Sequence, residues 1–183
     1  MGFLARWLTD AITLGLALAF ALAAMQVPAL THDYAAALLQ VAEDARRDIG
    51  QREASARHFY NLTGDTDDSI IAALRPYEPS NAATLTVSVD RMRILRAAYD
   101  RIAAAPPLLR PVTAVLDTIA DPKGYKAAVL ETTLDTYSPQ VVIGTAAAIY
   151  GLIGLAIGSF VAQLVISTAA NLGRRRPGDR VET

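Results

Sequence analysis

Two long runs without a charged residue, one toward each end of the chain, most constrain what the chain can fold into. No Asp, Glu, Lys or Arg stands between Asp10 and Asp33, and none stands between Asp135 and Arg174. A helix needs about 20 mostly apolar residues to cross the roughly 30 Å hydrocarbon core of a bilayer. The first run is just long enough, and the second can cross with tilt or continue past the bilayer surface. We therefore expect an integral membrane protein with two transmembrane helices.

The first run also allows a second interpretation, a secretory signal peptide that is cleaved. Arg6 supplies a basic start, and the small residues Ala21, Ala23 and Ala24 resemble a cleavage site. The apolar character nevertheless continues beyond these alanines to Leu30. This continuation favours the transmembrane interpretation.

Basic residues indicate the orientation of the two helices. Arg174, Arg175 and Arg176 directly follow the second run, and Arg6 precedes the first. Because basic residues near membrane ends favour the cytoplasmic side, we expect both termini in the cytoplasm and the middle in the periplasm, with the helices in a bacterial inner membrane. The expected parts are an N-terminal transmembrane helix, a periplasmic helical domain, a glycine-rich C-terminal transmembrane helix and a basic cytoplasmic tail, over residues 1–28, 29–138, 139–173 and 174–183.

Two long amphipathic helices are predicted in the middle of the chain. Apolar residues recur there at steps of three and four, and charged residues fill the other positions, which is typical of a helix with one buried face. The first helix is expected over residues 29–61, after Pro28, which should bend or restart the helix, and the second over residues 84–104. Since each has one apolar stripe to bury, we expect an antiparallel pair. The stripes are Tyr34, Leu38, Val41, Ala45, Ile49, Ala56 and Phe59 in the first helix, and Leu85, Val89, Met92, Leu95 or Ile94, Tyr99 and Ile102 in the second.

Three shorter helices are predicted around this pair. One follows Gly64, with an aspartate as its N-cap, and ends before Pro76. The last begins with Asp121 as N-cap and Pro122 in its first turn. No convincing alternation with period two occurs, so the expected fold class is all-α, with two transmembrane helices flanking an extracytoplasmic helical bundle. Apolar residues at helical spacing are Leu109, Val112, Leu116 and Ile119 in the middle helix, and Tyr125, Val129 and Leu134 in the last.

Three short motifs stand near the ends of these elements: Gln26-Val27-Pro28, Asp121-Pro122 and Leu134-Asp135-Thr136-Tyr137-Ser138-Pro139. With them the chain resembles a bacterial family of small inner-membrane proteins that is catalogued only as a domain of unknown function. The resemblance extends over most of the chain and is least clear over residues 50–90. It implies a membrane helix at each end with a helical extracytoplasmic region between them, and it implies no catalytic residue.

The sequence carries no pattern of a catalytic, cofactor-binding or metal-binding site. Cysteine is absent, which excludes disulfides, thiolate metal sites and thiol catalysis. The two histidines, His32 and His58, lack HExxH-type spacing, and the acidic segment at 64–68 lacks EF-hand spacing, so helix capping explains it. A net charge of −1 gives no argument for nucleic acid as a partner. We therefore expect a protein that is not an enzyme and uses no cofactor.

Small residues form a continuous stripe along the second predicted membrane helix. Glycine costs a helix about 1 kcal/mol per position relative to alanine. In lipid, however, it lets another helix backbone approach closely. Three partners are open: the chain's own first helix through Gly15, Ala19 and Ala23, another membrane subunit, or a second copy. The stripe consists of Gly144, Ala147, Gly151, Gly154, Gly158 and Ala162.

These features together favour a non-catalytic accessory or structural subunit of a bacterial inner-membrane assembly. Its expected partners are membrane lipids and either other integral membrane subunits or further copies of itself. Docking is expected through the glycine stripe and the periplasmic helical module. The alternative is a carrier or sensor that binds an apolar ligand, such as a quinone or a lipid, between its helices. An enclosed apolar pocket would favour the carrier, and an exposed apolar patch would favour the docking subunit.

Overall fold

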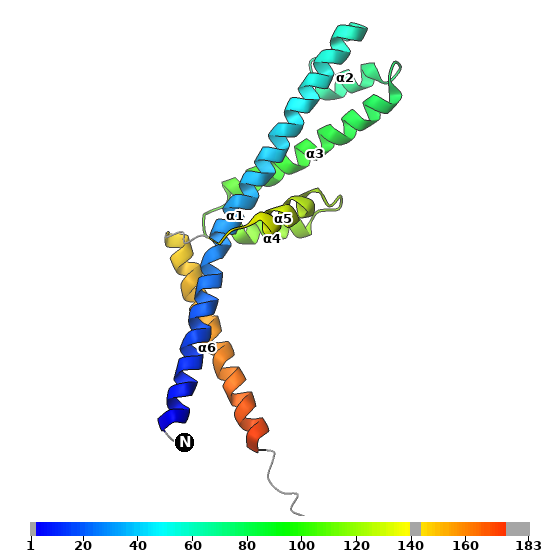
Figure 1. The fold of residues 1–183 in the computed structure, drawn as a ribbon. Coiled ribbons are helices and arrows are strands. Elements are labelled where there is room, and N and C mark those ends of the chain that lie inside the picture. The colour runs from blue at the N-terminus through cyan, green and yellow to red at the C-terminus, as the bar shows by residue number, and fades with distance from the viewer. Residues whose placement is uncertain (1–2, 140–143, 175–183) are drawn as a thin grey trace, which may run out of the picture. The chain divides into compact units, whose positions relative to one another are not determined.

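The structure is a computed structural model that describes residues 3–139 and 144–174. Within these two ranges it contains six helices and no strand, so the expected all-α class is confirmed (Figure 1). The described residues form two compact units. Unit 1 holds those up to Ala29 and from Pro139 onward, and unit 2 holds Leu30–Ser138. The helices are α1 (Phe3–Tyr60), α2 (Asp67–Leu74), α3 (Pro79–Ala104), α4 (Arg110–Ile119), α5 (Tyr125–Thr136) and α6 (Thr145–Arg174).

Helix α1 is continuous over 58 residues, and Pro28 lies inside it. A new helix therefore does not start after this proline, and of the two predicted alternatives the restart is wrong. Proline removes one backbone donor and costs a helix interior about 3 kcal/mol. The residues around Pro28 include several strong helix formers, and the turns after it are held by the buried side chains of Tyr34 and Leu38. Propensity and packing together outweigh the missing hydrogen bond.

In unit 2, α1 and α3 pair antiparallel, as predicted. Residues 34–42 of α1 pack with residues 95–102 of α3. Residues 49–56 of α1 pack with residues 82–89 of α3. Each predicted stripe residue is buried or half-buried except Phe59, which is 77% exposed. The cluster nearer Leu30 is built from Tyr34, Leu38, Ala42, Leu95, Ala98, Ile102, Ala114 and Val129. The second cluster is built from Ile49, Ala56, Ile71, Leu74, Ala82, Leu85 and Val89.

Helix α2 begins with a capping box. Its N-cap is Thr66, so the predicted aspartate cap is wrong. The backbone N–H of Ser69 donates to the Thr66 hydroxyl at 3.3 Å, and the backbone N–H of Thr66 donates to the Ser69 hydroxyl at 3.2 Å. Asp67 and Asp68 instead occupy the first turn, where carboxylates interact favourably with the helix dipole.

Helix α4 buries its small residues and exposes its large apolar ones. Pro111 and Ala114 face the core, whereas Val112, Leu116 and Ile119 are 50%, 62% and 77% exposed. The spacing of these residues predicted the helix correctly. It could not show that the opposite, smaller face would meet α3 and α5.

Helix α5 starts later than the sequence indicated. Pro122 lies in the turn before the helix, and Gly124 is the N-cap, with a φ of 72° that glycine adopts without strain. The side chain of Asp121 nevertheless caps the first turn of the helix. Its Oδ2 atom accepts hydrogen bonds from the backbone N–H groups of Lys126 at 2.7 Å and Ala127 at 3.1 Å.

The inner face of α5 differs from the predicted one by a single position. Val129 is buried and Tyr125 is half-buried, as expected. Leu134 is 51% exposed, and Thr133 is buried in its place. The Thr133 hydroxyl donates to the main-chain oxygen of Val129 at 2.8 Å, so burying this polar group leaves no donor unsatisfied.

In unit 1, the first part of α1 and helix α6 are each long and apolar enough to cross a membrane. Most of their large apolar side chains point outward and not into a protein core. Trp7, Leu14, Leu152 and Phe160 are each 60% exposed or more. Water-soluble proteins rarely expose apolar surface on this scale, so the surroundings that suit unit 1 are apolar.

Candidate functional site

The small-residue stripe of α6 lies against the first part of α1, inside unit 1. Gly151, Gly154 and Gly158 are buried, and Ala147 and Ala162 are 2% and 0% exposed. The atoms nearest to the three glycines all belong to residues 16–25. Of the three partners that the sequence left open, the structure therefore shows the chain's own first helix on this stripe.

Two of these glycines face backbone atoms that cannot move aside. A Cβ added at Gly158 would lie 2.9 Å from the Cα of Ala17. One added at Gly154 would lie 3.0 Å from the Cα of Ala21 and closer still to the main-chain oxygen of Phe20. Real Cβ atoms essentially never approach within 3.0 Å, so a side chain at either position would force the helices apart. At Gly151 the nearest atom is Cγ of Met25 at 2.8 Å, and this flexible side chain can shift.

The partner residues on α1 differ from those expected. Gly15 has no atom within 4 Å of an added Cβ, and Ala19 and Ala23 are exposed. The contacts instead come from the neighbouring stripe that contains Ala17 and Ala21. Both stripes have helical spacing and small residues, so spacing alone could not distinguish them.

Four predicted residues remain, one at the start of the stripe and three in the basic tail. Gly144 precedes α6 and has nothing within 4 Å of an added Cβ, so it does not take part in the close packing. Arg174 is the last residue of α6. Arg175 and Arg176 lie outside the described residues.

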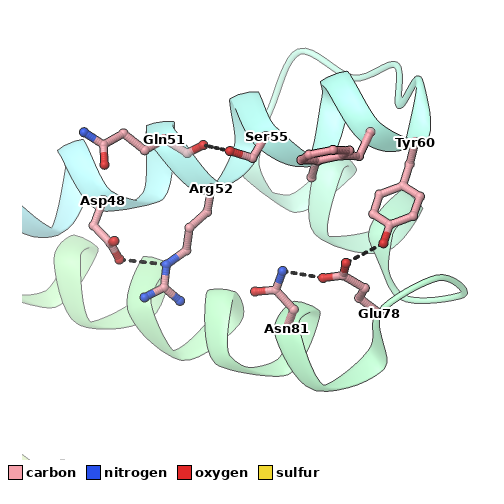
Figure 2. A pocket seen from close by; sticks show the side chains of 9 residues that line it. Asp48, Gln51, Arg52, Ser55, Tyr60, Glu78 and Asn81 are labelled. Carbon is pink, nitrogen blue, oxygen red and sulfur yellow. Dashed lines mark hydrogen bonds and ion pairs between the residues drawn. The ribbon is translucent and has the colours of Figure 1, made fainter.

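A surface pocket of about 400 Å³ lies between the end of α1 and the start of α3, within unit 2 (Figure 2). Charged and polar side chains form much of its lining. The Nε atom of Arg52 is 2.9 Å from Oδ2 of Asp48. The Asn81 side chain donates to Oε2 of Glu78 at 2.6 Å. The lining residues are Asp48, Gln51, Arg52, Ser55, Ala56, Phe59, Tyr60, Glu78 and Asn81.

Glu78 is held from two sides at the edge of this pocket. Its Oε1 atom accepts a hydrogen bond from the Tyr60 hydroxyl, and its Oε2 atom accepts one from Asn81. These two bonds lower the pKa of Glu78 below its ordinary value, and the bond from Tyr60 has the larger effect. The two hydrogen bonds therefore favour the ionised carboxylate and fix its position, so this end of unit 2 presents fixed polar groups.

Exposed aromatic side chains stand beside the pocket. Tyr77 stacks on Tyr60 with ring centroids 4.9 Å apart and is 59% exposed. Phe59 is 77% exposed. We call Phe59, Tyr60 and Tyr77 the aromatic tip. The energetic centres of protein interfaces are enriched in Tyr, Trp and Arg, so this composition suits protein docking.

Sequence reasoning missed the aromatic tip because Phe59 continues the buried stripe of α1 by spacing. Helix α3, the antiparallel partner of α1, does not reach far enough to cover Phe59. Helix α3 begins at Pro79, and the last buried residue of α1 in the cluster that contains Ala82 is Ala56, with only the half-buried Tyr60 packed beyond it. The stripe predicted for the first helix is longer than the stripe predicted for the second, and this difference was the available signal that one end of the first stripe would stay uncovered.

A buried lysine, Lys126, connects α4 and α5 at the end of unit 2 that contains Leu30. The Lys126 side chain is 5% exposed and lies 3.2 Å from Oδ2 of Asp117 without hydrogen-bond alignment. Its ammonium group instead donates to the main-chain oxygens of Asp117 and Ala120. Arg101 donates to Oδ1 of Asp117 at 2.8 Å, which adds α3 to the cluster. Since the charges pair with one another and with main-chain groups, the cluster serves to hold three helices together.

The described residues show no arrangement that suits metal binding. No group of three or more His, Cys, Asp and Glu side chains among them could hold an ion. His32 and His58 are both exposed. In the acidic segment at 64–68, Thr66 caps α2, and Asp67 and Asp68 lie in the first turn of this helix.

A protein-family model matches residues 8–175, which include most of both units. The chain therefore belongs to the family described as "Protein of unknown function (DUF2937)". This agrees with the resemblance to a domain of unknown function that the sequence motifs indicated. No curated protein and no solved structure matches the chain.

Proposed function

We propose that this member of the DUF2937 family is a non-catalytic accessory or structural subunit of a bacterial inner-membrane assembly. Two apolar helices anchor it, and unit 2 docks another protein. The observation that carries the docking role is the aromatic tip beside the polar pocket. An exposed aromatic cluster with fixed hydrogen-bonding groups around it offers both the apolar area and the specificity that an interface needs.

The glycine stripe has a different role in this proposal. Gly154 and Gly158 approach the chain's own first helix. In lipid, such close packing replaces the hydrophobic effect as the force that holds helices together. The stripe therefore assembles the anchor, and recognition of other proteins is assigned to unit 2.

The position of the aromatic tip along α1 also suits docking. Tyr60 follows Leu30 by thirty residues in one continuous helix, which corresponds to about 45 Å along the axis. With both termini in the cytoplasm, as the basic residues at Arg6 and Arg174 favour, unit 2 lies in the periplasm. The tip would then meet its partners in the periplasm.

The pocket does not favour the alternative of a quinone or lipid carrier. Asp48, Arg52 and Glu78 contribute charged groups to its lining. Apolar ligands bind in cavities lined mainly by apolar and aromatic side chains. For this reason we prefer the docking subunit.

The test is site-specific photo-crosslinking in intact cells. The chain has no cysteine, so one introduced cysteine gives a single attachment point for a benzophenone crosslinker. A cysteine at Phe59 should yield a discrete crosslinked partner that mass spectrometry identifies. A cysteine at Ala127, an exposed residue of α5, is the matched control and should not yield that product.

The same pattern from both positions, or no product from Phe59, would show that the aromatic tip does not dock a protein. A second variant tests the energetic role of the tip. Tyr77→Ala should reduce capture of the identified partner at least several-fold, because the exposed ring is lost while the fold is kept.

A further inference from the structure

Helix α4 presents a face of aliphatic side chains to the outside of unit 2. The helix packs inward through Pro111 and Ala114, and its opposite side is exposed. We call this opposite side the α4 face. Its members, all 50–77% exposed, are Leu109, Val112, Val115, Leu116 and Ile119.

No charged side chain interrupts the α4 face. The helix contains two charged residues, Arg110 and Asp117. Arg110 turns back and donates to the main-chain oxygens of Ala105 and Ala103 at 3.1 and 3.2 Å. Asp117 is 10% exposed and pairs on the inner side of the helix. The water-facing sides of α1 and α3, by contrast, carry several ion pairs.

Helix α4 lies at the Leu30 end of unit 2. The hydroxyl oxygens of Tyr34 and Thr118 are 3.0 Å apart, and Ala114 belongs to the same core cluster as Tyr34. Tyr34 follows Leu30 by four residues, about 6 Å along the axis of α1. Figure 1 shows α4 beside this part of α1, whereas α2 lies at the other end of the α1–α3 pair. The α4 face thus stands close to the point where the chain enters its first apolar segment.

We propose that α4 lies in the headgroup region of the bilayer, with the α4 face against phospholipid acyl chains. This inference rests on the membrane anchoring proposed above. Helices with one apolar and one polar side lie in the plane of the interface and bury the apolar side in the acyl boundary. At 10 residues, or about 15 Å, α4 is too short to cross the bilayer but long enough to lie in it.

The composition of the α4 face favours lipid over a protein partner. Its members are Leu, Val and Ile only. Protein interfaces draw most of their binding energy from Trp, Tyr and Arg, and Leu and Val are under-represented among their energetic centres. The exposed aromatic side chains of unit 2, Phe59 and Tyr77, lie beside the pocket at its other end, and none belongs to the α4 face. The two ends of unit 2 therefore suit two different surroundings.

The experiment places one environment-sensitive fluorophore on the full protein in nanodiscs of phosphatidylethanolamine and phosphatidylglycerol. Single cysteines at Leu116 and Ile119 report on the α4 face. A cysteine at Val87, 55% exposed on α3, is the water-facing control. A cysteine at Ile157, 50% exposed on α6, reports on the anchor itself. Each sample is measured with and without nitroxide-labelled phospholipid.

We expect labels at Leu116 and Ile119 to emit at shorter wavelength than the label at Val87. Nitroxide lipid should quench them at least twofold more. Labels on the α4 face that match Val87 would overturn the inference. Shielded labels that lipid nitroxides do not quench would also overturn it, because another protein or a second copy would then cover the face.

The Ile157 label separates this inference from the proposed anchoring. Strong quenching at Ile157 without quenching at Leu116 would reject the interfacial position of α4 and leave the anchor intact. Absence of quenching at Ile157 would reject the membrane anchoring, and with it the basis of the inference.

Discussion

Leu95 is fully buried between α3 and α1, in the cluster that also contains Leu38 and Ile102. Replacing it with alanine removes apolar contacts and leaves a cavity that the helices cannot fully close. We expect Leu95→Ala to lower the free energy of unfolding by about 2–5 kcal/mol. Circular dichroism of the full protein in nanodiscs during denaturant unfolding measures this. Val87→Ala, at an exposed site of the same helix, should change it by less than about 0.5 kcal/mol.

Glu78 gives unit 2 a dependence on pH. Hydrogen bonds from Tyr60 and Asn81 lower its pKa in the folded state, so the ionised form stabilises the fold. A lowered folded pKa contributes stability above the unfolded value, near 4.3, and the contribution is lost as the pH falls through the folded value. The melting temperature of wild type should therefore exceed that of Glu78→Gln at pH 7, and the difference should shrink below about pH 4. A difference that stays constant with pH would contradict this account.

At the level of helices, the pairing of α6 with α1 depends on the absence of side chains at the crossing. Gly154→Leu should separate the two helices, because the added atoms would meet the backbone at Ala21. Spin labels at the exposed residues Ala19 and Ile157 measure the change as a longer inter-label distance. Leu155→Ala, on the outward side of α6, is the control and should leave the distance unchanged. An unaltered distance in the Gly154 variant would mean that the glycines do not set the pairing.

The helical type of the segments could be predicted from periodicity, but their number and two of their faces could not, because α1 joins two of the predicted helices. In α1 and α3 the apolar residues occupy one side only, so burial of Leu38 and Leu95 follows directly. In α4 the large apolar residues share the outward side, whereas the inward side carries Pro111, Ala114 and the paired Asp117. Close helix packing favours the smaller side, and no spacing rule contains that information. The continuity of α1 through Pro28 was missed for a related reason, because tertiary packing outweighs local propensity.

At the scale of the whole molecule, the arginines at 6 and 174–176 predict that both termini lie in the cytoplasm. A reporter that is active only in the cytoplasm, fused at Thr183, should be active. A reporter that is active only in the periplasm, inserted at the connection around Gly64, should also be active. A cytoplasmic signal from the Gly64 insertion would overturn the orientation.

The candidate sites could be predicted only where they depend on local composition. The glycines of α6 are visible in the sequence because small residues repeat at helical steps within an apolar run. The pocket joins residues of α1 with Glu78 and Asn81, which lie some twenty to thirty residues later in the chain. Such a site exists only once α1 and α3 have paired. Its residues carry no shared motif, so the sequence offered no basis for grouping them.

The antiparallel pairing of α1 and α3 has a consequence for biosynthesis. Tyr34 leaves the ribosome sixty-eight residues before Ile102, its neighbour in the core, so the apolar stripe of α1 waits uncovered until α3 has been made. Helix α6 is made last, yet it supplies half of the close packing in unit 1. All residues of unit 2 are thus synthesised while the nascent chain has only its first apolar helix available for anchoring. Because its core contains no residue of α6, unit 2 can complete its folding before the helix pair of unit 1 closes.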